Sequence, residues 1–141
     1  KKIKYVFVPM SADFLHHGHT NLLMKASKLG KVIVGLMTDK GIKSYKKNYP
    51  LISYQDRKKL VSSIKFVKKI IPINGLEYVK TAKKFKFDYF VHGDDWKKGV
   101  QSSERKKLII AMKLWKGKVK DFKYTKKISS SLIKKNTKDR T

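Results

Sequence analysis

Residues 3–38 read IKYVFVPMSADFLHHGHTNLLMKASKLGKVIVGLMT, and this stretch decides the fold. Its two ends, residues 3–9 and 31–38, are continuous apolar runs rich in β-branched and aromatic side chains, which is typical of buried parallel strands. Residues 20–30 predict a helix that ends at Gly30, because apolar residues recur there at helical spacing: Leu22, Leu23, Ala26 and Leu29. The stretch therefore predicts a strand, a loop, a helix and a second, parallel strand.

The rest of the chain continues this alternation. Further strands are predicted at residues 68–73, 88–93 and 118–125, and further helices at 53–67, 76–85, 102–117 and, as a short last helix, 129–135. Residues 39–51 carry no periodic pattern and predict a loop, and Ser53 is a suitable N-cap for the helix that follows. We predict an α/β fold of one domain, a five-stranded parallel sheet with helices on both faces. This domain spans residues 1–135, and residues 136–141 form a tail.

The composition excludes several classes of protein. The chain has no cysteine, so disulfides, thiolate zinc sites and thiol nucleophiles are excluded. No apolar run approaches the roughly 20 residues that a membrane-spanning helix needs, and residues 1–10 do not resemble a secretory signal. We therefore expect a cytoplasmic protein that does not insert into a membrane.

The net charge of +26 raises the question of nucleic-acid binding. Only three of the 36 basic residues are arginine, namely Arg57, Arg105 and Arg140, and the lysines are scattered over the polar positions. Base and phosphate recognition in nucleic acids depends strongly on the planar fork of arginine. We therefore expect no nucleic-acid partner, and a positive field that steers a smaller anionic ligand.

Three of the four histidines lie within residues 16–19, directly after the first predicted strand. A zinc site is disfavoured, because no cysteine is available and a spacing of three in a loop that enters a helix is not a usual zinc pair. Gly18 allows a ligand to approach the backbone, and the N-terminus of the next helix offers free N–H groups to an anion. The pattern predicts a phosphate cradle made by His16 and His19, with His17 facing solvent.

Polar motifs follow four of the five predicted strands. They are the histidine loop, the TD pair at 38–39, HGDDW at 92–96 and YTKKISSS at 124–131. Because the carboxyl ends of parallel strands lie at one edge of the sheet, these motifs converge there, where α/β proteins bind ligands. This convergence predicts an active site.

Five of these segments resemble, in order, the HxGH-type nucleotidyltransferases and their cytidylyltransferase branch. The segments are DFLHHGH, TDKGIKSYKK, SYQDRKKLVSSIKFV, HGDDW and YTKKISSSLI, and they extend from Tyr5 to about Lys134. The resemblance implies a Rossmann-like fold, a cytidylyltransferase domain over residues 1–135 and a homodimer. It also implies the transfer of CMP from CTP to a small phosphonate or phosphomonoester with release of pyrophosphate. A divalent ion, usually Mg²⁺, would be held by the CTP phosphates, with Asp13 as the one candidate protein contact.

The resemblance assigns roles to individual residues. His16 and His19 would bind the triphosphate and stabilise the leaving pyrophosphate. Lys46 would neutralise the α-phosphate and contact the acceptor, with Lys43 and Lys47 as the alternatives. Arg57 would read the cytosine, and the three serines would hold the β- and γ-phosphates. The full nucleotide-binding set is Val8, Pro9, Met10, Asp13, Phe14, Gly18, Arg57, His92, Gly93, Asp94, Trp96, Thr125, Ile128, Ser129, Ser130 and Ser131.

Simpler roles stand beside these. Asp94 and Asp95 could cap a helix, Trp96 could belong to the core, His92 could be a packed histidine, and the serine triplet is also an N-cap.

The acceptor is predicted from departures from the glycerol-3-phosphate pattern. Tyr124 stands where that pattern has arginine, and Lys127 where it has glycine; Tyr124 is accordingly placed at the acceptor beside Lys46. Together with VHGDDWKKGVQ, these residues resemble the phosphonate cytidylyltransferases. We expect 2-aminoethylphosphonate first, phosphocholine or phosphoethanolamine second and glycerol 3-phosphate third, with Tyr45, Tyr49 and Tyr54 as candidates for contacting an ammonium group. The alternatives are adenylyl transfer within the same superfamily and a basic nucleic-acid-binding module without catalysis.

Overall fold

A computed structural model describes residues 2–99 and 101–123 of the chain. The elements are β1 (Tyr5–Met10), α1 (His17–Ser27), β2 (Lys31–Met37), α2 (Asp39–Lys46), α3 (Tyr54–Ser62), β3 (Val67–Ile73), α4 (Tyr78–Phe85), β4 (Tyr89–Gly93), the 3-10 turn η1 (Asp94–Lys97), α5 (Ser102–Met112), the 3-10 turn η2 (Lys113–Trp115) and β5 (Lys118–Phe122). All neighbouring strands pair in parallel, in the order β3-β2-β1-β4-β5. The predicted α/β fold with a five-stranded parallel sheet is confirmed.

The strand order creates a switch point between β1 and β4. The chain leaves β1 for β2 and β3 on one side and then returns to build β4 and β5 on the other side. In open parallel sheets, the loops that leave such a pair of strands turn to opposite faces, and the crevice between them receives ligands. The carboxyl ends of β1 and β4 therefore mark the place where a site is expected.

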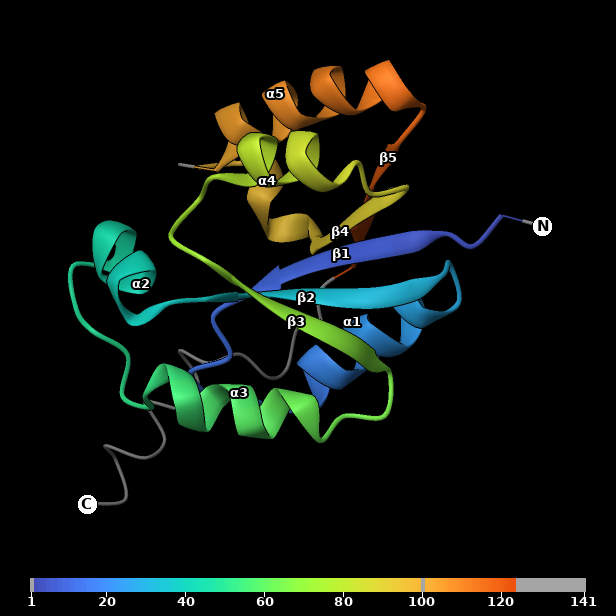
Figure 1. Cartoon of the computed structure of the whole chain (residues 1–141). Coiled ribbons are helices and arrows are strands. Elements are labelled where there is room, and N and C mark those ends of the chain that lie inside the picture. Colours follow the sequence, from blue (N-terminus) through green and yellow to red (C-terminus); the bar gives the residue numbers. More distant parts are fainter. Residues whose placement is uncertain (1, 100, 124–141) are drawn as a thin grey trace.

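Helices cover both faces of the sheet, α4 and α5 on one face and α1 and α3 on the other (Figure 1). Successive residues of β1 point to opposite faces, and all of them except Tyr5 are buried. Val6 and Val8 pack with Leu23 of α1 and Val61 of α3, whereas Phe7 belongs to the second cluster, beneath α4 and α5. The continuous apolar run of β1 is thus explained by burial on both faces.

The prediction of a loop over residues 39–51 is wrong, because Asp39–Lys46 form helix α2. Thr38 caps this helix by accepting the Gly41 N–H at 3.0 Å, and Lys47 ends it with a left-handed φ of 67°. Among its side chains only Ile42 is fully buried, and Tyr45 packs partly against the same core cluster. A helix of two turns with one buried apolar side chain leaves no periodic signal in the sequence.

Helix boundaries differ from the predictions at two glycines. α1 begins at His17 instead of residue 20 and ends at Ser27, before Gly30. A Cβ at Gly30 would collide with the Lys4 carbonyl, so this glycine serves the close approach of two chain segments and does not cap the helix. α5 likewise ends at Met112, and Lys116, not Gly117, takes the left-handed conformation. Ser53 caps α3 as predicted, accepting the Asp56 N–H.

The end of the predicted fifth strand, the short helix at 129–135 and the tail at 136–141 lie outside the described residues.

Candidate active site

A hollow of about 140 Å³ opens at the switch point of the sheet. Its lining includes Pro9 and Met10 from the end of β1, His92 and Gly93 from the end of β4, and His19 from α1. The nucleotide-binding residues predicted at both strand ends are thus brought together.

A smaller cleft of about 30 Å³ shares His19, Leu22 and Gly93 with this hollow. Gly18 lines it too, together with the ammonium-bearing side chains of Lys25 and Lys123. The cleft is therefore bordered by a helix N-terminus and two cations, a combination that favours an anion.

The two histidines of the motif cap α1 together. His16 is the N-cap residue, and its Nδ1 accepts the Gly18 N–H at 3.0 Å. His19 lies three residues on, and its Nδ1 accepts the His16 N–H at 3.2 Å. Reciprocal bonds of this kind form a capping box, here built from two imidazoles instead of a hydroxyl and a carboxylate. The rings are 4.3 Å apart between centroids.

This arrangement fixes the protonation of both rings. An imidazole nitrogen that accepts a hydrogen bond carries no proton, so the proton of each neutral ring is on Nε2. Burial, followed by the nearby His17, lowers the pKa of His16. Burial, followed by the nearby His16, lowers the pKa of His19 to about 4. At neutral pH the two side chains are therefore neutral donors through Nε2–H, and the buried Nε2 of His16 has no partner among the described residues.

Lys46 lies near this pair, in the last turn of α2. Its positive charge contributes to the lowered pKa of His19, and its Nζ lies 5.7 Å from the centre of the Tyr45 ring. Lys43 instead donates from Nζ to the Lys47 carbonyl at 2.9 Å, at the end of its own helix. Among the candidate lysines, this geometry favours Lys46 as the one that serves the site.

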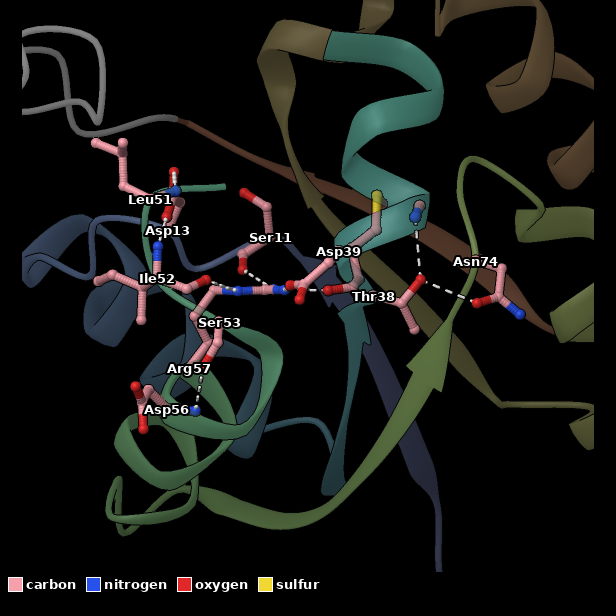
Figure 2. A network of polar contacts seen from close by, with 12 residues as sticks. Ser11, Asp13, Thr38, Asp39, Leu51, Ile52, Ser53, Asp56, Arg57 and Asn74 are labelled. Atoms are coloured by element: carbon pink, nitrogen blue, oxygen red, sulfur yellow. Dashed lines mark hydrogen bonds and ion pairs between the residues drawn. The ribbon is translucent and has the colours of Figure 1, made fainter. Parts of the chain in front are cut away.

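Asp13 and Arg57 are buried and belong to a polar network beside the hollow (Figure 2). The Asp13 carboxylate accepts the N–H groups of Leu51 and Ile52 at 3.1 and 2.9 Å, so it orders the segment before α3. The Arg57 side chain is fully buried and forms four hydrogen bonds, three to main-chain carbonyls and one to Asp39. Cytosine reading by Arg57 stays a prediction.

Trp96 lies behind the hollow and supports it. Its indole stacks on His92 at 4.2 Å between ring centroids, and its Nε1–H donates to Asp121 of β5. Arg105 of α5 pairs with the same carboxylate at 2.6 Å. His92, although partly packed, also lines the hollow.

Other predicted residues are separated from the hollow or lie outside the described part. Val8 is fully buried in the sheet core. Asp94 opens η1, and Phe14 lies in the loop before α1. Five nucleotide-binding predictions and the acceptor residue Tyr124 lie outside the described residues: Thr125, Ile128, Ser129, Ser130 and Ser131.

The comparisons with known proteins agree with this geometry. A family model described as cytidylyltransferase-like matches residues 8–136. The chain belongs to the cytidylyltransferase-like family. A glycerol-3-phosphate cytidylyltransferase of Bacillus spizizenii is 38% identical over 98 residues, which cover 67% of this chain and 74% of that one. The resemblance drawn from the five sequence segments is confirmed, and the chain is an enzyme of the cytidylyltransferase type.

Two further relatives differ in size and in described role. An ethanolamine-phosphate cytidylyltransferase of Mus musculus is 37% identical over 87 residues, covering 59% of this chain but 21% of the mouse protein. A crystal structure described as the lipopolysaccharide core biosynthesis protein of Thermoplasma volcanium superposes with a TM-score of 0.69 at 25% identity, covering 87% of this chain and 99% of that one.

The cytidylyltransferase hollow also contains residues that the sequence analysis did not assign to the site. Tyr78 from the start of α4 and Gln101 before α5 line it, and the Tyr78 hydroxyl donates to Gln101 Oε1 at 3.2 Å. Asp95 lines it as well, with its carboxylate 3.7 Å from Nδ1 of His92. The sequence indicated Tyr78 and Gln101 only by their place at the start of helices that follow strands. The fold is needed to show that both residues reach the hollow.

Metal-binding side chains are not clustered in this cytidylyltransferase: within residues 2–99 and 101–123, no three His, Asp or Glu side chains gather around one point. Both oxygens of the Asp13 carboxylate already accept main-chain hydrogen bonds. In the same ranges, no helix has the length and apolar content needed to cross a bilayer.

Proposed function

We propose that this enzyme transfers CMP from CTP to a small phosphonate or phosphomonoester that carries an amine, with 2-aminoethylphosphonate as the first candidate. An acceptor oxygen attacks the α-phosphorus and forms a new P–O bond. The bond from the α-phosphorus to the bridging oxygen breaks, and pyrophosphate leaves with the electron pair. The chemistry needs alignment and charge stabilisation rather than a protein nucleophile.

The observation that carries the proposal is the pair of neutral Nε2–H donors of His16 and His19 at the switch point of the sheet. Each donor is held by a main-chain hydrogen bond to the other ring nitrogen, so it needs no rearrangement as charge develops on phosphate oxygens. Lys25 and Lys123 in the adjoining cleft supply positive charge for the departing pyrophosphate.

The other side of the hollow favours an ammonium-bearing acceptor. Tyr45 and Tyr78 provide aromatic surface there, and Asp95 provides a negative charge. Burial, and then the nearby Tyr45, raises the pKa of Tyr78, so its ring remains neutral. Aromatic faces together with a carboxylate attract a primary or quaternary ammonium group. Glycerol 3-phosphate has no cation to place against them.

Glycerol 3-phosphate nevertheless stands as the rival acceptor, because the Bacillus spizizenii relative is named for it. The mouse relative, named for ethanolamine phosphate, favours an amine. Adenylyl transfer to a small metabolite is the second alternative, and it differs only in the nucleotide.

Pyrophosphate release with Mg²⁺ tests the proposal. CTP and ATP are compared against 2-aminoethylphosphonate, phosphoethanolamine, phosphocholine and glycerol 3-phosphate. We expect the highest kcat/KM with CTP and an amine-bearing acceptor. Turnover with glycerol 3-phosphate alone would overturn the acceptor class, and turnover with ATP alone would overturn the nucleotide.

A matched pair of variants tests the ammonium contact. Asp95→Asn should raise KM for the amine-bearing acceptors about tenfold and leave KM for CTP unchanged. Glu77→Gln is the control, because Glu77 is an exposed carboxylate beside Tyr78 that faces Lys80 instead of the hollow. Equal KM values for the amine in wild type and Asp95→Asn would contradict the contact.

Three further parts of the proposal rest on the family resemblance. Mg²⁺ would be held by the CTP phosphates and would neutralise charge on the phosphate oxygens. The enzyme would work in the cytoplasm and as a homodimer. Sedimentation analysis at micromolar concentration measures the assembly state directly.

A further inference from the structure

Arg57 joins four segments of the chain through one buried guanidinium (Figure 2). Its Nη1 donates to the Ser11 carbonyl after β1 at 2.7 Å and to the Met37 carbonyl at the end of β2 at 2.6 Å. Its Nε donates to the Ile52 carbonyl at 2.9 Å. Its Nη2 pairs with Asp39, the first residue of α2, at 2.7 Å. A single side chain therefore ties the loop that leads to the histidines to the helix that carries Lys46.

The segment between α2 and α3 is held from both sides. The Ile52 N–H donates to Asp13, which lies in the histidine loop, and the Ile52 carbonyl accepts from Arg57. A second tie holds the start of α2, because Thr38 Oγ1 both accepts the Gly41 N–H and donates to Asn74 after β3. Both ends of the connection that contains α2 are thus fixed by polar contacts.

Apolar packing alone gives α2 little support. Ile42 is its one large buried side chain, and Tyr45 packs only partly against the core while also lining the hollow. Lys46 is near enough to His19 for its charge to lower the pKa of that histidine. In Figure 1, α2 stands apart from the two helix layers, at the carboxyl end of β2. The position of Lys46 relative to His19 therefore depends on the polar ties at the start of α2, and among these the Arg57–Asp39 ion pair is the charged one.

We propose that Arg57, through its pair with Asp39, is a positioning residue that sets α2, and with it Lys46, against the histidine loop. This inference rests on the proposed function only for the role of Lys46 in turnover. It gives Arg57 a task different from base reading: the residue contacts no nucleotide, and its loss changes the rate without changing the choice between CTP and ATP.

Asp39→Asn is the variant of choice, because Asp39 is 42% exposed while Arg57 is fully buried. Asparagine keeps the Oδ1 acceptor for Nη2 and removes only the charge, whereas truncating the guanidinium would leave three main-chain carbonyls without their donor. Asp56→Asn is the matched control: Asp56 lies on α3 next to Arg57, and its N–H contacts Ser53. Its carboxylate does not pair with the guanidinium.

The first readout is a double-mutant cycle with Lys46→Ala. Asp39→Asn should lower kcat roughly 10- to 100-fold, since small misplacements of a reacting group cost this much. KM for CTP should stay within twofold, as should the CTP-to-ATP ratio of kcat/KM. In the Lys46→Ala background, the same substitution should change kcat less than twofold. Equal losses in both backgrounds, or a changed CTP-to-ATP ratio, would overturn the inference.

The second readout needs no turnover and so stands even if every acceptor fails. The charge of Lys46 helps lower the pKa of His19, and NMR titration of the His19 ring detects its proximity. Asp39→Asn should raise the pKa of His19, and the shift should vanish in the Lys46→Ala background. An unchanged His19 titration in Asp39→Asn would show that α2 keeps its place without the pair and would overturn the inference. A silent acceptor panel with a shifted His19 would instead count against the proposed function alone.

Discussion

The main-chain N–H of His16 donates to Nδ1 of His19 at 3.2 Å, so the second histidine of the motif holds the first residue of the helix cap. Nδ1 of His16 in turn accepts the Gly18 N–H. One nitrogen of each ring accepts a main-chain hydrogen bond; the His19 ring lines the hollow, and the other nitrogen of His16 is buried with no partner among the described residues. The three-residue spacing of the two histidines therefore serves the cap of α1 as well as the proposed phosphate binding. Mutation can separate these two roles.

His16→Asn should separate capping from turnover. Asparagine is a strong N-cap residue whose Oδ1 can accept the Gly18 N–H, but it lacks the Nε2–H donor. We expect the free energy of unfolding to change by less than about 1 kcal/mol, the usual size of a cap effect. Turnover should fall roughly 10²- to 10³-fold, as for loss of one preorganised donor.

Urea unfolding and pyrophosphate release measure these two effects on the same preparation. His17→Asn serves as the control, because His17 is exposed. Full turnover in His16→Asn would contradict the donor role.

Acidification below pH 6.5 should destabilise the free protein through His19. Folding lowers the pKa of His19 from 6.5 to about 4. Between these two values the His19 ring is protonated in the unfolded chain and neutral in the folded chain. Stability from this group is complete above pH 6.5 and is lost as the pH falls toward 4, by up to about 1.4 kcal/mol per pH unit. His16 and His92 shift in the same direction.

The free energy of unfolding, measured from pH 7.5 to 4.5, tests this pH dependence. His19→Asn should flatten the slope and His17→Asn should not. A slope that is identical in wild type and His19→Asn would show that His19 is not the cause.

Asp121→Ala should weaken both the fold and the nucleotide pocket. The Asp121 carboxylate accepts from the Trp96 indole and pairs with Arg105, and the Arg105 guanidinium and the Trp96 N–H help hold its pKa below the ordinary value. Its removal leaves a buried indole N–H unsatisfied, at a cost of about 1–3 kcal/mol.

His92 stacks on the same indole, so KM for CTP should rise as well. Calorimetric unfolding and CTP titration check the two effects. Asp121→Asn, which keeps an acceptor for Trp96, should restore part of the stability; no difference between the two variants would argue against the indole bond.

Gly35→Ala should destabilise the sheet centre. Gly35 lies on β2 in register with Pro9 of β1, and a Cβ there would overlap the end of the Phe7 ring. Overpacking of this kind typically costs about 1–3 kcal/mol.

Phe7→Leu shortens the ring that causes the overlap, so Gly35→Ala should cost less in that background. Thermal unfolding of the four proteins in the cycle measures the coupling. Additive losses would show that the Phe7 ring is not the obstacle.

Most of the fold could be read from local pattern. Residues 31–38 form a continuous apolar run, as expected for a strand whose two faces are both covered. Such a run predicts an interior strand of a parallel sheet and not a solvent-exposed edge strand. α2 escaped prediction because a two-turn helix with one buried apolar residue, Ile42, is defined by its Thr38 cap and by contacts distant in sequence. The residues of the site divide in the same way. His16, His19 and Gly93 belong to motifs and could be predicted, whereas Tyr78 and Gln101 belong to no motif and could not.

The sequence by itself determined the alternation of strands and helices, the family, and the place of the site after β1 and β4, because these depend on periodicity and on motifs that are short in sequence. Only the tertiary structure decided that Arg57 is buried, and that Asp13 and Arg57 bind the N–H and the carbonyl of Ile52. Those properties depend on hydrogen bonds between residues as many as 46 positions apart. A linear pattern cannot encode which distant donor meets which acceptor; packing of the sheet and its helices sets that choice.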